Sequence, residues 1–182
     1  MNLDVPTLMI AGALVAAMSG SSLLVVRYQY RDTSPVVWWA AANFVLAFGM
    51  LMLARDGTEM TFASSPFTLF AVNPVLIWIG ARRFDGRPAP LAVALLGAAL
   101  PALLEALGIL SLDTASGFRA LHIVHTAVGI GFYLAAAGSL ALNRSDALRA
   151  RWPLVVLCTL HAMALSLTVT DRFAGPPGMM GA

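Results

Sequence analysis

Three ionisable side chains lie inside apolar stretches, at positions where they could act together. Glu105 is close to the end of one stretch, and His122 and His125 are close to the start of the next. Residues three apart share one face of a helix, and two helices joined by a short loop run antiparallel. We therefore expect the carboxylate and the two imidazoles to lie at one depth. Ionisable groups inside membrane spans are costly and are candidates for function.

Two kinds of chemistry suit these residues. Two imidazoles and a carboxylate can bind a divalent metal, and histidine titrates near neutral pH, so the same groups could respond to protons. His161, in a later stretch, is expected about two helical turns deeper and outside the same metal shell. The plainer alternative is a hydrated histidine pair, with Glu105 turned outward or paired with Arg119. We predict a ligand- or proton-sensing site at Glu105, His122, His125 and His161, and the sequence requires no metal or other cofactor.

The sequence carries no motif for catalysis. It has no glycine-rich phosphate loop, no H-E-x-x-H and no cysteine pair with metal-ligand spacing. The single cysteine, Cys158, can form no internal disulfide and is interpreted as a small buried residue. The pI of about 9.2 comes from arginines at the ends of the apolar stretches. We therefore predict neither an enzymatic activity of the chain nor a nucleic-acid partner.

The elements that must position these residues are six apolar stretches. The hydrophobic fraction is 59% and the charged fraction 11%, against roughly 45–50% and about 25% in soluble domains. A membrane-spanning helix needs about 20 residues, and each stretch has about that length. None of the stretches alternates apolar with polar residues as a barrel strand would. The chain is predicted to be a single all-α domain, a polytopic integral membrane bundle of six transmembrane helices. The predicted spans cover residues 3–26, 36–53, 62–79, 89–110, 119–142 and 152–169.

The arginines are distributed unevenly between the connecting loops. Eight fall in the first, third and fifth loops, and three fall in the other loops and the tail. Short loops rich in basic residues stay in the cytoplasm, so both termini are predicted to lie outside a bacterial inner membrane. The eight cytoplasmic arginines are Arg27, Arg31, Arg82, Arg83, Arg87, Arg144, Arg149 and Arg151.

Two series of small residues recur at every fourth position. Small residues let helices approach closely in lipid, where no hydrophobic effect draws them together. The series could therefore be contact seams within the bundle or between two copies of the chain, although an alanine-rich composition also produces such triplets. They are Gly12, Ala16 and Gly20 in the first stretch, and Ala127, Gly131 and Ala135 in the fifth.

Two asparagines and a proline interrupt the second and third stretches. Asn43 and Asn73 both lie roughly 10 Å from the cytoplasmic end, counting about 1.5 Å per residue. We predict that they hydrogen-bond to each other across the helix pair, as a structural contact in preference to a ligand contact. Pro74 removes one backbone hydrogen bond and is predicted to kink its helix.

A resemblance follows from two segments. The run NPVLIWIGARRFDGRPAP at residues 73–90, and the opening Leu3-Asp4-Val5, resemble the N-terminal multi-span membrane module of bacterial GGDEF-domain proteins, the diguanylate cyclases. The resemblance implies a sensory or anchoring module whose cytoplasmic output domain makes cyclic di-GMP from GTP. No GGDEF sequence is present, so no catalytic residue carries over. The tail at 170–182, with Pro176-Pro177 between glycines, is predicted to precede a missing span that would lead back to the cytoplasm.

The sequence therefore predicts the membrane-sensing or anchoring part of a bacterial signalling protein. Its expected partners are the lipid bilayer, a second copy of the chain and an output domain absent from this sequence. A small transporter or channel subunit is the main alternative, because transporters place polar groups on broken helices at mid-membrane. A third interpretation is a plain membrane anchor for dimerisation.

Overall fold

The computed structural model describes residues 4–30, 34–56, 66–107, 115–142 and 151–173. These form six α-helices, so the all-α prediction is confirmed. The helices are α1 (Val5–Gln29), α2 (Ser34–Asp56), α3 (Pro66–Phe84), α4 (Leu91–Ala106), α5 (Ala115–Leu142) and α6 (Arg151–Phe173).

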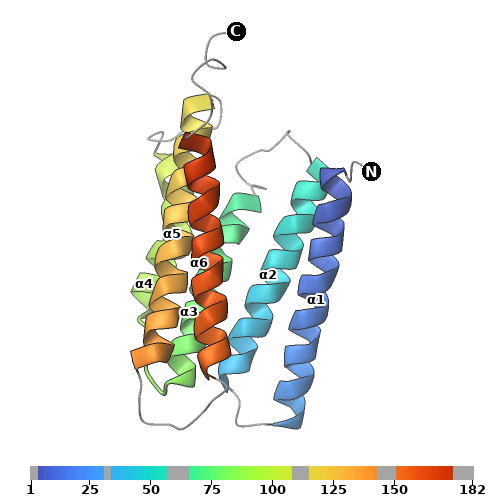
Figure 1. Ribbon diagram of the computed structural model, residues 1–182, viewed down its shortest axis with the longest axis vertical. Helices are drawn as coiled ribbons and strands as arrows, with labels where there is room; N and C mark the ends of the chain where they lie inside the picture. The colour runs from blue at the N-terminus through green and yellow to red at the C-terminus, as the bar shows by residue number, and fades with distance from the viewer. Residues whose placement is uncertain (1–3, 31–33, 57–65, 108–114, 143–150, 174–182) are drawn as a thin grey trace.

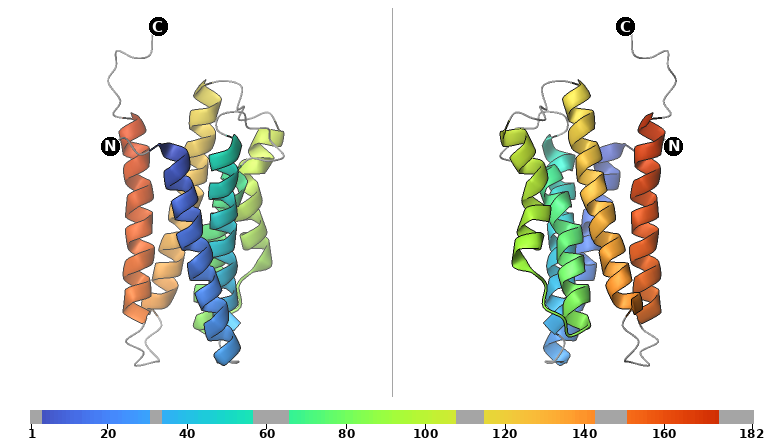
Figure 2. Two further views of the ribbon diagram at one scale, coloured as in Figure 1. Left: turned by 90° about the vertical axis from the view of Figure 1, so that its right-hand side faces the viewer. Right: turned by 90° about the vertical axis from the view of Figure 1, so that its left-hand side faces the viewer.

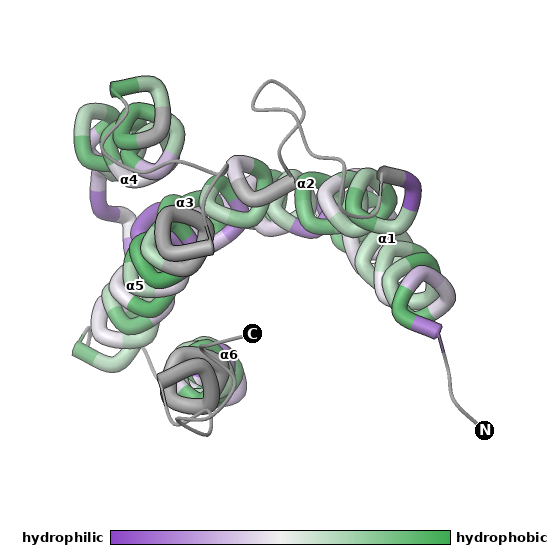
Figure 3. Tube along the Cα trace, turned by 90° about the horizontal axis from the view of Figure 1, so that it is seen from above, coloured by the Kyte–Doolittle hydropathy of each residue, from purple (hydrophilic) through white to green (hydrophobic). Residues whose placement is uncertain are grey.

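Successive helices run up and down, so α1 begins and α6 finishes at the same end of the bundle (Figure 1). Helix α3 is central and packs against α2, α4 and α5, whereas α1 packs on α2 and α6 packs on α5. Viewed along the helices, α1, α2, α3 and α5 form a curved row, and α6 stands on its concave side (Figure 3). Helix α4 lies at the opposite edge from α6 (Figure 2).

The interior is built from small residues, and large apolar side chains face outward. Most of the buried hydrophobic residues are alanines, and Leu140 is the one large side chain with under 2% exposure in the described part of the chain. By contrast, Met18 is 70% exposed and Leu96 is 64% exposed. A water-soluble domain would bury such side chains. Small residues between helices and large apolar residues outside them are the arrangement expected in lipid.

Within the residues that the structure describes, three helical segments are long and apolar enough to cross a membrane, namely Val5–Gln29, Ser34–Arg55 and Ala120–Leu142. Two shorter apolar segments are Leu91–Leu104 and Arg151–Leu167. The chain thus contains helices that are compatible with membrane insertion.

The helix bounds differ from the predicted spans by up to five residues: α5 begins four residues earlier than predicted, α6 ends four residues later, and α3 and α4 are also shifted. Helix α3 continues past residue 79 through Arg82 and Arg83 and ends at Phe84, because a polar helical turn can extend an apolar span into the interface. Helix α4 begins only at Leu91, since Pro88 and Pro90 precede it and disfavour helix in the residues before them.

Candidate functional site

The predicted sensing residues occupy two separate places. His122 and His125 lie on α5, where His125 is 7% exposed and His122 is partly buried. The backbone of Glu105 lies in the last turn of α4, at the end of the bundle where α5 starts, but its side chain is outside the described residues. Within the described part of the chain, no three metal-ligating side chains gather.

His161 belongs to a different environment from the α5 histidines. It is exposed on α6, and its Nδ1–H donates to the Leu157 carbonyl one turn earlier, at 3.0 Å. Its ring lies 5.2 Å from the Tyr133 ring, centroid to centroid. As predicted from its position, it is not grouped with the α5 histidines.

Asn73 of α3 makes polar contacts with two other helices. Its amide nitrogen donates to the Ala42 carbonyl of α2 at 2.8 Å, and its amide oxygen accepts from the Tyr133 hydroxyl of α5 at 2.7 Å. Asn73 is 5% exposed, so both bonds are shielded. One buried amide therefore ties three helices together.

The predicted bond between Asn43 and Asn73 is wrong. Asn43 donates instead to the Trp39 carbonyl of its own helix at 2.9 Å. An equal depth in the membrane fixes the separation along the helix axis, but it does not fix the direction around it. Asn73 donates to the carbonyl of Ala42, the residue before Asn43. The prediction was therefore right about the helix pair and wrong about the acceptor.

Helix α3 continues without a break through Pro74. Pro74 has no N–H, so the Phe70 carbonyl loses its helical donor. The residue is buried, on the helix that contacts α2, α4 and α5.

An aromatic contact fixes α2 against α3 near the arginine-rich end. The Trp39 indole N–H donates to the Ile77 carbonyl at 3.2 Å, and a Cβ at Gly80 would overlap this indole ring. The ring also lies 5.9 Å from the Phe84 ring. Glycine at position 80 is what lets the tryptophan lie directly on the α3 backbone.

The end of α3 and the turn after it form a defined helix stop. Gly86 has φ +68°, its N–H bonds to the Arg83 carbonyl at 3.1 Å, and the Arg87 N–H bonds to the Arg82 carbonyl at 2.9 Å. These two bonds form a Schellman motif with glycine in the left-handed conformation. The Arg82 Nε–H donates to the Pro88 carbonyl at 2.7 Å and fastens the turn.

The same turn is connected to the start of α6 by an ion pair. A guanidinium nitrogen of Arg151 lies 3.9 Å from the Asp85 carboxylate, and the two side chains are 6% and 0% exposed. Sequence reasoning treated Arg151 only as a topology determinant and did not single out Asp85. Arg27, Arg82, Arg83 and Arg87 lie in the described residues at this end, and Arg31, Arg144 and Arg149 lie outside them.

A cavity of about 220 Å³ lies between α6 and the other helices near this end. Asn43, Cys158 and Trp39 are among the residues that line it. Its remaining lining is apolar and comes from Leu23, Ile77, Ala81, Leu140, Leu154 and Leu157. No motif in the sequence pointed to this space, because it arises where five helices meet incompletely.

The two small-residue series lie in opposite environments. In α1, Ala16 and Gly20 are buried and the series faces α2, where a Cβ at Gly20 would lie 3.2 Å from the Ala40 carbonyl oxygen. In α5, Ala127, Gly131 and Ala135 are all exposed. Within this chain, the α5 series is therefore no helix-packing seam.

Comparisons of the chain with protein-family models, with curated proteins and with solved structures found no match.

Proposed function

We propose that this chain is a six-span module of the bacterial inner membrane that serves as the sensory or anchoring input of a signalling protein. Both termini face outward, and the arginine-rich end of the bundle faces the cytoplasm. The output domain is one that forms cyclic di-GMP. The inverted surface, with alanines inside and large apolar side chains outside, supports the placement in lipid.

The observation that carries the proposal is the connection between the Asp85 turn and α6. Helix α6 packs along α5 but leaves a cavity toward α1, α2 and α3, and its first residue is held by Asp85. A helix that is fastened at one end and incompletely packed along its side is suited to shift. A stimulus moves such a helix only if it binds one packing more tightly than the other.

The stimulus is proposed to act at the outer end of the bundle, which holds His122 and His125 of α5 and the last turn of α4 with Glu105. His125 is largely buried, so a ligand or proton that reaches it changes the α5 surroundings directly. Helix α5 then carries the change to α3 through the Tyr133–Asn73 bond and to α6 through the Tyr133–His161 ring contact.

The membrane architecture is tested by labelling single cysteines. Replacement of Cys158, the one native cysteine, by alanine gives a background for Arg55→Cys and Arg87→Cys, two exposed arginines near opposite ends of the bundle. A membrane-impermeant thiol reagent should label Arg55→Cys in intact cells, and Arg87→Cys only after permeabilisation. Labelling of Arg87→Cys in intact cells overturns the orientation.

The signalling role is tested on the full reading frame in its own cells, with cyclic di-GMP as the readout. Stimuli such as external pH and divalent metals should change its level, and His125→Ala and Glu105→Gln should abolish that response. If both variants respond like the wild type to every stimulus, the outer site is not the sensor. Solute flux in liposomes containing the chain would indicate the transporter instead.

A further inference from the structure

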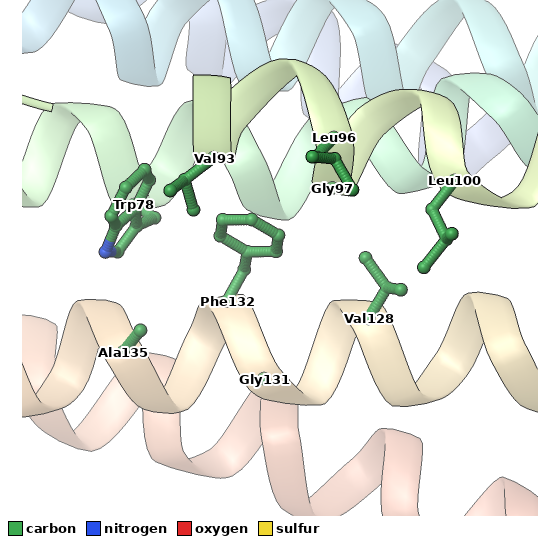
Figure 4. A pocket seen from close by; sticks show the side chains of 9 residues that line it. All are labelled: Trp78, Val93, Leu96, Gly97, Leu100, Val128, Gly131, Phe132 and Ala135. Carbon is green, nitrogen blue, oxygen red and sulfur yellow. The ribbon is translucent and has the colours of Figure 1, made fainter. Parts of the chain in front are cut away.

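An apolar groove runs between α4 and α5, away from the cavity beside α6. Its volume is about 480 Å³, within the range of ligand sites. Side chains of the two helices face each other across it, and Trp78 of α3 closes one end (Figure 4). The lining residues are Trp78, Val93, Leu96, Gly97, Leu100, Val128, Gly131, Phe132 and Ala135.

The groove exists because α4 and α5 touch at few places. The Phe132 ring lies over Gly97, where a Cβ would overlap it, so the helices meet closely at that point. Beside it, a Cβ at Gly131 would meet no atom within 4 Å. Gly131 and Ala135, two exposed small residues of α5, therefore line the groove on the α5 side.

A fixed positive charge lies at the closed end of the groove. The Arg82 guanidinium lies 5.5 Å from the centroid of the Trp78 ring, and its Nε–H is held by the Pro88 carbonyl. The other guanidinium nitrogens form no ion pair with a described carboxylate. Arg83 and Arg87 are also exposed at this end of α3 and in the turn after it, but Arg82 is the arginine that contacts Trp78, a residue of the groove.

We infer that this groove binds an anionic phospholipid, with one acyl chain between α4 and α5 and the phosphate at Arg82. An apolar wall that leads to a basic end matches the layout of a lipid with a charged headgroup. A zwitterionic lipid would bring a second positive charge toward the arginines. The inference rests on the membrane placement proposed above, but not on the signalling role.

The test is native mass spectrometry of the full chain, purified in detergent and titrated with dioleoyl phosphatidylglycerol or dioleoyl phosphatidylcholine. We expect one phosphatidylglycerol to bind more tightly than phosphatidylcholine. One basic residue near a membrane surface corresponds to roughly a fivefold change in affinity. Arg82→Gln should therefore weaken phosphatidylglycerol binding about fivefold, and Arg82→Lys should restore most of it.

Matched variants separate this site from general lipid adhesion. Gly131→Leu should fill the groove and abolish the bound lipid, whereas Gly138→Leu should not, because Gly138 also has open space at its Cβ but does not line the groove. Arg83→Gln, one residue from Arg82, should retain binding. Equal binding of the two lipids, or equal binding by Gly131→Leu and Gly138→Leu, overturns the inference. If cysteine labelling is as expected and lipid binding is not, only the groove is wrong.

Discussion

The helix pairs α1–α2 and α5–α6 are both antiparallel hairpins, and both contain small residues at every fourth position, but they are held together differently. In α1 the series lies against α2, with Gly12 near Met50 and Gly20 near the Ala40 backbone. In α5 the corresponding series is exposed, and α6 is met by other residues, such as Gly129 near Leu165. The α5–α6 hairpin also has an ionic connection to α3, through Arg151 and Asp85.

The difference shows what a small-residue series establishes. Such a series permits two helix backbones to approach closely, but the number of neighbouring helices decides whether the series lies in a helix contact. Among the described helices, α1 packs mainly against α2, so its face of small residues is used for that one contact. Helix α5 is contacted by α3, α4 and α6, and its larger side chains define those contacts. The N-terminal hairpin thus depends on backbone proximity, and the C-terminal hairpin depends on specific side chains.

The largest effect is expected at the ion pair. Arg151→Leu removes the guanidinium that pairs with the buried Asp85 carboxylate, and breaking a buried pair costs about 3 kcal/mol. The measurement is the free energy of unfolding in mixed micelles titrated with SDS. Arg87→Leu, at an exposed arginine of the same end, should change it by less than about 0.5 kcal/mol. If the two variants lower the free energy of unfolding equally, the ion pair does not distinguish the C-terminal hairpin from the N-terminal one.

The next effect tests the two small-residue series directly. Gly20→Leu should destabilise the protein by about 2 kcal/mol, since overpacking costs about 1–3 kcal/mol and the nearest obstacle includes the Ala40 carbonyl oxygen. Gly131→Leu should be close to neutral, because its side chain enters open space. The same unfolding titration compares them. A greater loss for Gly131→Leu would mean that a second copy of the chain covers the α5 series.

Much of the fold follows from hydropathy and from chain punctuation. Long apolar runs predict helices whatever their partners, and Pro88, Pro90 and Gly86 determine where α3 ends and α4 begins. The contact partners of each helix do not follow in the same way. They depend on rotation about the helix axis, which an almost uniformly apolar sequence barely encodes. That is why Asn43 and Asn73 were assigned to the correct helix pair but to the wrong bond.

The candidate sites also divide into features that the sequence predicts and features that it does not. The position of His122 and His125 in the first half of α5 could be deduced from the apolar stretch that contains them. The pairing of Asp85 with Arg151 could not, because it joins a turn and the start of a helix that are more than 60 residues apart. An acidic residue in an otherwise basic loop was the one signal available. The cavity beside α6 and the groove beside α4 arise from incomplete packing, which no local pattern records.

A smaller effect is expected at the amide that joins the two hairpins through α3. Asn73→Leu removes the bonds to Ala42 and Tyr133. At about 0.6 kcal/mol for each interhelical bond in a membrane protein, the loss should be about 1 kcal/mol in the unfolding titration. Asn43→Leu removes only a bond within α2 and should change stability by less than about 0.5 kcal/mol. A larger loss of stability for Asn43→Leu than for Asn73→Leu would make Asn43 the principal polar contact.

The smallest effect divides the Asn73 contribution between the two hairpins. Tyr133→Phe removes only the bond to α5 and keeps the ring against His161, so about 0.6 kcal/mol should be lost. The Asn73 amide nitrogen remains bonded to the Ala42 carbonyl, which keeps α2 attached to α3. If Tyr133→Phe costs as much as Asn73→Leu, the bond to α2 contributes nothing to stability. The N-terminal hairpin would then be held to the bundle by the Trp39 contact and by close packing alone.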